Sequence, residues 1–64
     1  MENSIGDKLK MLRGEKTLEK VSIDTGIGVS TLSNYEQNLR VPRDQNKKML
    51  ADYYNTTVDN IFFS

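Results

Sequence analysis

The stretch from Thr17 to Pro42, TLEKVSIDTGIGVSTLSNYEQNLRVP, decides the fold of this chain. A segment with helical apolar spacing ends at Gly26, and three residues later a second helical segment begins, which closes at Glu36. Glycine readily adopts the positive φ angle that terminates a helix. The stretch therefore predicts two helices joined by a tight glycine turn.

Apolar periodicity along the whole chain predicts an all-α fold of five helices, without strands or repeats, in a single domain of residues 1–64. The expected helices cover about residues 4–13, 18–25, 29–37, 44–54 and 58–62 or 58–63. The expected N-caps are Asn3 or Ser4, Thr17, Gly28 and Thr57. The expected terminating residues are Gly14, Gly26, Asn38 and Asn55.

The same spacing predicts which side chains face the core. The expected inward residues are Ile5, Leu9, Leu12, Leu18, Val21, Ser22, Thr25, Leu32, Tyr35, Met49, Leu50, Tyr53 and Tyr54. Ile23 falls off the inward face of its helix, and the sequence gives no partner that would cover it.

Composition excludes several classes of function. The 64 residues contain neither cysteine nor histidine, so disulfides, thiolate metal sites and the commonest general base are absent. We therefore expect no catalytic residue, no metal, no cofactor and no small-molecule ligand. No apolar run approaches the roughly 20 residues of a membrane span, and the start MENSIGDKLK lacks the apolar core of a secretory signal. A cytoplasmic protein without membrane contact is the expectation.

Charge is balanced overall but unevenly distributed. The formal net charge is +0, whereas a basic excess is typical of nucleic-acid binders. Basic residues outnumber acidic ones between positions 8 and 20 and between positions 40 and 48, and none occurs between positions 21 and 36. Any attraction to nucleic acid must therefore come from segments that flank the helix expected at residues 29–37.

Four pieces of the sequence, in order, are IGDKLKMLR, TGIGVSTLSNYE, LRVP and LADYYNTTVDNIFF. Together they resemble the lambda-repressor-like helix-turn-helix family, also called the Xre family, over nearly the whole chain. The resemblance implies a bacterial or phage-encoded, nucleoid-associated protein with a five-helix fold, in which residues 29–37 enter the DNA major groove. The chain departs from the family pattern in having Gln37-Asn38 where Asn-Gly is usual. It also has no clear counterpart to the family's glutamine near the start of the second helix.

Carried over by position, the resemblance implies roles for particular residues. Base edges would be read by Val29, Ser30, Ser33 and Asn34. Arg13 and Glu36 would form a structural pair that ties the first helix to the third. Contacts to the DNA backbone are expected from Thr17, Thr31, Arg40, Arg43 and Lys47, with Lys10, Lys16 and Lys20 as weaker candidates near the second helix.

The chemistry of the expected base-reading face favours A·T pairs. An asparagine such as Asn34 can bond adenine through two atoms, serine hydroxyls make single hydrogen bonds, and Val29 can contact a thymine methyl. No arginine, the commonest partner of guanine, is present on this helix. The alternative is that the same residues form an ordinary solvated helix face.

Apolar residues gather at the C-terminal end. Val58, Ile61, Phe62 and Phe63 are expected to form a homodimer interface, with Ile61 directed inward and Phe62 or Phe63 at a two-fold contact. The alternative is that Ile61 and Phe62 close the core of the single chain. A two-fold dimer would require a palindromic operator.

The sequence thus predicts a sequence-specific regulator of transcription that binds double-stranded DNA, most simply a repressor. The alternative from another class is a protein-interaction module on the same fold, such as the antitoxin of a toxin–antitoxin pair. Such a module would bind through the apolar C-terminal end or through Ile23. An enzyme is a distant third option.

Overall fold

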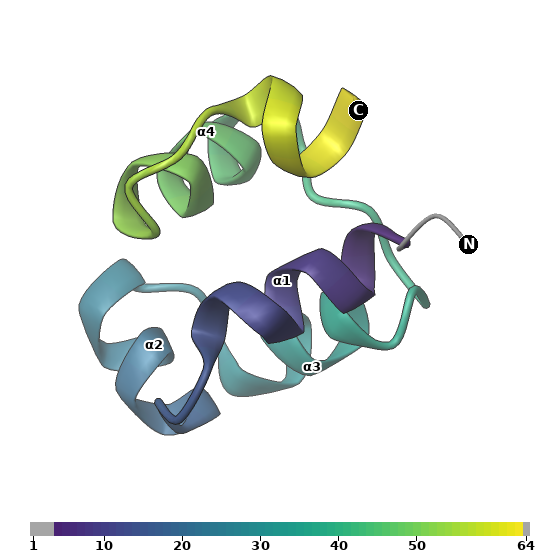
Figure 1. The fold of residues 1–64 in the computed structure, drawn as a ribbon. Helices are drawn as coiled ribbons and strands as arrows, with labels where there is room; N and C mark the ends of the chain where they lie inside the picture. The colour runs from purple at the N-terminus through teal and green to yellow at the C-terminus, as the bar shows by residue number, and fades with distance from the viewer. Residues whose placement is uncertain (1–3, 64) are drawn as a thin grey trace.

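The structure, a computed structural model, describes residues 4–63, which form five helices and no strand (Figure 1). The helices are α1 (Ile5–Arg13), α2 (Leu18–Thr25), α3 (Val29–Glu36), α4 (Asp44–Tyr53) and a short π-helix, η1 (Asp59–Phe63). The prediction of an all-α architecture is confirmed for these residues. The last helix differs from the expected α-helix in its hydrogen-bond spacing, because most of it is wound as a π-helix.

Side-chain caps begin three of the helices where the sequence predicts them. The hydroxyl of Ser4 accepts the Asp7 N–H at 3.1 Å, and the hydroxyl of Thr17 accepts the Lys20 N–H at 3.1 Å. The Thr57 hydroxyl accepts the N–H of residue 60 at 3.1 Å, at the start of η1. Each cap satisfies a backbone donor that has no partner inside its helix. Asn3, the alternative cap of α1, lies outside the described residues.

Left-handed residues end the helices as predicted. Gly26 follows α2 with φ 78°, and Asn38 and Asn55 adopt φ 62° and 57° shortly after α3 and α4. Glycine and asparagine tolerate this conformation better than other residues. The expected bounds of α1, α3 and α4 each shift by one residue, since Ser4 is an N-cap and Gln37 and Tyr54 are C-caps rather than helical residues.

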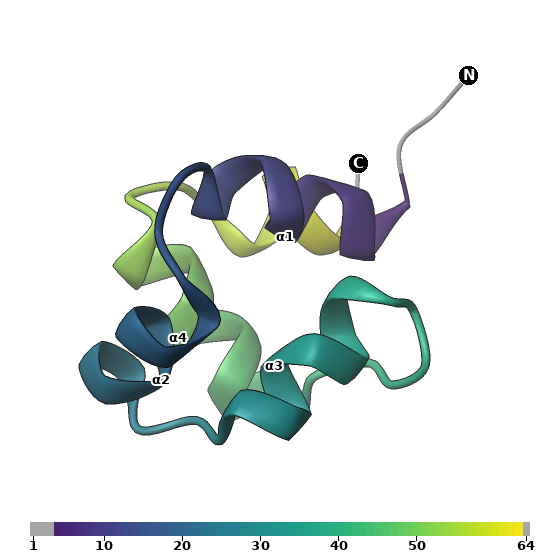
Figure 2. The same ribbon diagram turned by 90° about the horizontal axis from the view of Figure 1, so that it is seen from below.

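Each helix sends side chains into one small core. The core residues are Leu9, Val21, Ile27, Leu32, Tyr35, Leu50, Ala51, Ile61 and Phe62. Ile5, Leu18, Tyr53, Tyr54 and Val58 are partly buried against this core. Figure 1 shows α4 and η1 above α1, α2 and α3, and Figure 2 shows the same arrangement from below.

Some predictions of inward residues are wrong. Met49 is 42% exposed, because the inward face of α4 is centred on Leu50 and Ala51 and leaves Met49 at its edge. Leu12 lies at the edge of α1 and is also exposed. Ile27, in the connection between α2 and α3, is buried although it lies outside the periodic apolar pattern of both helices.

Candidate nucleic-acid interface

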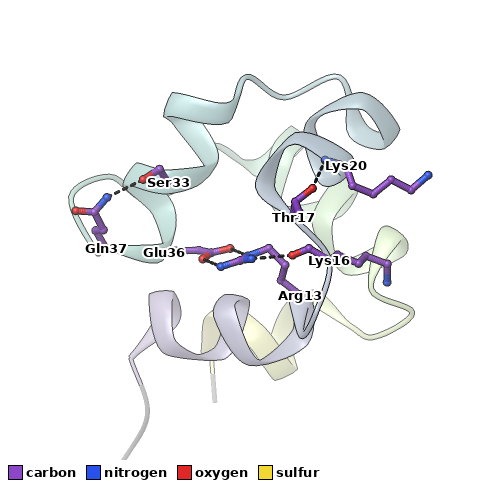
Figure 3. A network of polar contacts seen from close by, with 7 residues as sticks. All are labelled: Arg13, Lys16, Thr17, Lys20, Ser33, Glu36 and Gln37. Atoms are coloured by element: carbon purple, nitrogen blue, oxygen red, sulfur yellow. Dashed lines mark hydrogen bonds and ion pairs between the residues drawn. The ribbon is translucent and has the colours of Figure 1, made fainter.

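The position of α3 is fixed first by an ion pair with α1. The Arg13 guanidinium donates from Nε to Glu36 Oε2 at 2.7 Å and from Nη2 to Glu36 Oε1 at 2.9 Å (Figure 3). Its Nη1 donates to the carbonyl of Lys16 at 2.7 Å, so the same guanidinium also holds the connection between α1 and α2. The two paired side chains are only 18% and 10% exposed. The hydrogen bond to Glu36 raises the pKa of Arg13, so Arg13 stays charged and engaged inside the chain.

A second contact fixes the C-terminal end of α3 against the start of α1. The Gly6 N–H donates to Asn38 Oδ1 at 2.9 Å, and Asn38 Nδ2 donates to Ser4 Oγ at 3.0 Å. A Cβ atom at position 6 would collide with the Glu36 carbonyl and would lie 2.9 Å from the Asn38 amide. Glycine is therefore needed where the two helices approach most closely. Sequence reasoning missed this contact because nothing local links residues that are 32 positions apart.

The N-terminal end of α3 is held through the connection to α2. The buried Thr25 hydroxyl donates to the Val21 carbonyl at 2.7 Å and accepts the Ile27 N–H at 3.2 Å. Ile27 itself fills the core directly before α3 begins. Both ends of α3 are thus anchored, and the helix presents its outward side from a fixed position.

The four predicted base-reading residues lie on this outward side. Val29 and Ser30 are exposed, and Ser33 and Asn34 are half-buried one turn further along. Positions separated by three or four residues share one face of a helix, so the structure brings these side chains together. Ser33 is not isolated there, because its hydroxyl accepts Gln37 Nε2 at 2.7 Å (Figure 3). Sequence reasoning did not count Gln37 among the site residues, although an i, i+4 polar pair was a usable signal.

The residues expected to contact the DNA backbone differ in exposure and in the hydrogen bonds they already make. Arg40 and Arg43 are exposed in the loop that follows α3, and the Arg40 N–H folds back on the Asn34 carbonyl at 3.3 Å. Thr31 is half-buried. The Thr17 hydroxyl already accepts a hydrogen bond as the cap of α2 and keeps only its own proton to donate.

Lys47 is less exposed than Arg40 and Arg43, and its expected contact to the DNA backbone stays a prediction. Its side chain is only 16% exposed and its ammonium lies 3.9 Å from an oxygen of Asp44. The same ammonium lies 4.9 Å from the ring centre of Phe63 and 5.7 Å from that of Phe62. Cation–π contacts of this kind stabilise packing, so Lys47 covers the aromatic end of the chain.

Two lysines near α2, Lys16 and Lys20, also contact other side chains of the chain. Lys20 pairs with Asp24 at 3.3 Å, and Lys16 lies 5.6 Å from the ring centre of Tyr53. The Tyr53 hydroxyl donates to Asp24 at 2.6 Å; this bond lowers the pKa of Asp24 and raises the pKa of Tyr53. Burial raises the pKa of the neighbouring Tyr54 to about 12. The cluster links α2 to α4, whereas Arg40 and Arg43 are the exposed cations that follow the end of α3 in the sequence.

The predicted dimer residues are split by burial. Ile61 and Phe62 are 1% and 8% exposed within a single chain. This agrees with the inward direction expected of Ile61 and with the alternative that both residues close the core, and the homodimer contact stays a prediction. Val58 packs partly against the same core. Phe63 is 67% exposed. The two aromatic residues of the last helix thus differ in exposure, since Phe62 is buried in the core and Phe63 lies at the surface.

Comparison of this chain with protein-family models, with curated proteins and with solved structures found no match. Within residues 4–63, no helix has the length and apolar character needed to cross a membrane. Over the same range, no three His, Cys, Asp or Glu side chains are grouped so that they could hold a metal ion.

Proposed function

We propose that this chain is a sequence-specific double-stranded DNA-binding protein with a lambda-repressor-like helix-turn-helix fold, and that it represses transcription by occupying an operator. The observation that carries the proposal is a short helix, α3, anchored at both ends and open on one polar side. Proteins that read DNA place such a helix in the major groove. In this proposal the protein works in the cytoplasm on DNA and needs no cofactor.

Val29, Ser30, Ser33 and Asn34 form the reading surface in this proposal. Amide and hydroxyl groups provide donors and acceptors for base edges, and Val29 provides apolar surface for a thymine methyl. The absence of arginine from α3 favours A·T pairs over guanine. The fixed backbone supports this role because a base contact requires side chains held in place before binding.

Arg40 and Arg43 supply the electrostatic attraction in this proposal. They are exposed, and the backbone at Arg40 is tied to the end of α3. Phosphate contacts position a protein on the duplex without carrying sequence information. Affinity is therefore expected to depend on few cations, and to fall with salt less steeply than that of strongly basic repressors.

A second copy of the chain completes the proposed operator complex. One chain has a longest dimension of 30 Å and presents one α3, whereas half-sites are spaced by about 34–36 Å. A homodimer on a palindromic site would provide two reading helices. Phe63, which is exposed, remains a candidate for the contact between copies, with the exposed part of Val58 beside it.

Selection of bound duplexes from a random pool tests the proposal. The full chain is mixed with random double-stranded DNA at about 0.15 M salt, and the retained duplexes are sequenced. We expect an enriched, two-fold symmetric motif rich in A·T pairs. Enrichment of G·C-rich half-sites would overturn the proposed base preference, and a retained pool with no enriched motif would overturn the proposed function.

Exposed apolar side chains favour a second candidate, the protein-interaction module. Ile23 is 80% exposed on α2, and a shallow groove of about 380 Å³ lies between α1 and η1, lined in part by Met11 and Leu12. An antitoxin could use such surfaces to bind its toxin. Three results together would favour this candidate. A small protein encoded next to this chain binds the chain, Ile23→Ser abolishes that binding, and the DNA selection gives no enriched motif.

A further inference from the structure

Ser33 and Gln37 form a preformed polar pair at the C-terminal end of α3. Gln37 Nε2 donates to Ser33 Oγ at 2.7 Å, and both side chains leave the outward side of the helix (Figure 3). The Gln37 backbone N–H also bonds the Ser33 carbonyl, at 3.0 Å. Residue 37 is thus tied to residue 33 through its side chain and through its main chain.

The backbone beside this pair is fixed as well. Asn38 takes the left-handed conformation and holds α1 through its hydrogen bonds to Gly6 and Ser4. The Gln37 side chain nevertheless remains exposed. A long, flexible amide normally loses conformational freedom when it binds, and here part of that loss has already occurred.

The hydrogen bond to Ser33 leaves a specific set of groups unused on Gln37. A glutamine amide has two N–H donors and a carbonyl acceptor. One N–H is directed to Ser33, so Oε1 and the second N–H remain for a ligand. A carbonyl and an N–H on one amide match the N6 donor and N7 acceptor of adenine, which glutamine reads in the major groove.

We propose that Gln37, oriented by Ser33, reads an adenine next to the bases read by Asn34. The inference rests on the proposed DNA-binding function and extends its reading surface to the end of α3. The N–H of Arg40 donates to the Asn34 carbonyl, so the loop that carries Arg40 begins beside this end of α3. If Arg40 contacts a phosphate, as proposed above, it would bring DNA toward Gln37. A contact from Gln37 to phosphate would instead be indifferent to sequence.

Binding measurements on single-base variants of one duplex test the inference. The preferred duplex of the wild-type chain is first found by selection. The dissociation constants of wild type, Gln37→Ala, Ser33→Ala and Gln45→Ala are then measured on that duplex, on each A·T to G·C variant of it and on a random duplex. Gln45 is the matched control, because it is an exposed glutamine on the first turn of α4.

We expect Gln37→Ala to weaken binding to the preferred duplex by about 10-fold, and to erase the preference at one A·T position. Binding to the random duplex should not change. Ser33→Ala should relax the same position by a smaller factor, since Gln37 is then present but no longer oriented, and it should in addition weaken the preference at the base that Ser33 itself contacts in the proposed function. Gln37→Glu removes the donors and should shift the preference at that position toward cytosine, whose N4 group donates to carboxylates.

Two results would overturn the inference while leaving the proposed function intact. One is an equal loss of affinity by Gln37→Ala on every duplex, which would assign Gln37 to phosphate. The other is an unchanged preference at every position in Gln37→Ala. A wild-type chain that prefers no duplex would overturn the proposed function together with this inference. Circular dichroism and melting of each variant ensure that a loss of binding is not a loss of folding.

Discussion

The two sides of α3 differ in how deeply their side chains are buried. On the inner side, Leu32 and Tyr35 are buried in the core, and Glu36 is held by two hydrogen bonds from Arg13. On the outer side, Val29 and Ser30 are exposed. This eight-residue helix stabilises the fold with its inner side, and in the proposed function its outer side presents groups to DNA. Substitutions on the two sides should therefore separate stability from binding.

The two sides differ in charge as well. The inner side carries the only charged residue of α3, Glu36, and its charge is matched by Arg13 inside the chain. The outer side is neutral, and the exposed cations Arg40 and Arg43 follow in the next loop. In the proposed complex, the helix then contributes specificity and the loop contributes electrostatic affinity.

The largest expected effect is on the inner side, in Glu36→Ala. Removing the carboxylate leaves the Arg13 guanidinium poorly hydrated and without its main partner, which costs about 3 kcal/mol. The melting temperature of a domain this small should fall by about 12–24 °C. Thermal denaturation measures it, with Glu15→Ala, an exposed glutamate in the α1–α2 connection, as control. Equal melting temperatures for wild type and Glu36→Ala would show that the pair does not stabilise α3.

Gly6→Ala should have the next largest effect. The added methyl collides with the Glu36 carbonyl and forces α1 and α3 apart. Alanine gains about 1 kcal/mol of helix propensity, but overpacking should leave a net loss of about 2 kcal/mol in the free energy of unfolding. Urea denaturation measures it. Gly28→Ala is the matched control, because its Cβ would meet only the Thr31 hydroxyl, at 3.9 Å; a Gly6→Ala chain as stable as Gly28→Ala would refute the close contact.

On the outer side, Asn34→Ala should weaken binding to the selected duplex by about 10-fold, because a bidentate contact to adenine is lost. Its melting temperature should stay within about 3 °C of wild type, since Asn34 is only half-buried and lies outside the core. Asn34→Asp should weaken binding at least as much, because it adds a charge that DNA repels. Unchanged binding by both variants, measured by fluorescence anisotropy, would return this face to an ordinary solvated surface.

The smallest expected effects distinguish Arg40 from Lys47. Arg40→Ala should reduce the slope of log K against log salt by about 0.9, as the loss of one phosphate contact requires. Lys47→Ala should leave that slope unchanged and reduce stability by about 0.5–1 kcal/mol through the lost cation–π contacts. Anisotropy titrations at several salt concentrations, together with urea denaturation, measure both quantities. An unchanged slope in Arg40→Ala and a reduced slope in Lys47→Ala would show that Lys47, and not Arg40, contacts a phosphate.

Local signals in the sequence predicted the helices well. Ser4, Thr17 and Thr57 cap helices through side chains that act within three residues, and Gly26 and Asn38 change the chain direction through their own φ angles. Such features depend on near neighbours, so they can be read from the sequence. The Arg13–Glu36 contact is distant in sequence, and only the family resemblance indicated it before the structure gave its geometry.

Features that depend on packing could not be predicted in the same way. The close approach at Gly6 and the exposure of Met49 follow from the angles at which helices meet, and no short sequence pattern encodes those angles. The distribution of the C-terminal apolar residues was ambiguous for the same reason. Phe62 enters the core while Phe63 is covered only in part by Lys47, and the two positions look equivalent in the sequence.

Nuclear magnetic resonance titration tests the central claim most directly. Backbone amide chemical shifts of the isotope-labelled full chain are followed while DNA is added at about 0.15 M salt. The DNA is the duplex recovered by selection or, if no duplex is recovered, a random duplex. We expect the largest changes along residues 29–37 and at Arg40 and Arg43, with none at Ile23 or in the groove beside Met11. Changes centred on Ile23 or Met11, with α3 unaffected, would contradict the claim that the outward side of α3 is the DNA-reading surface.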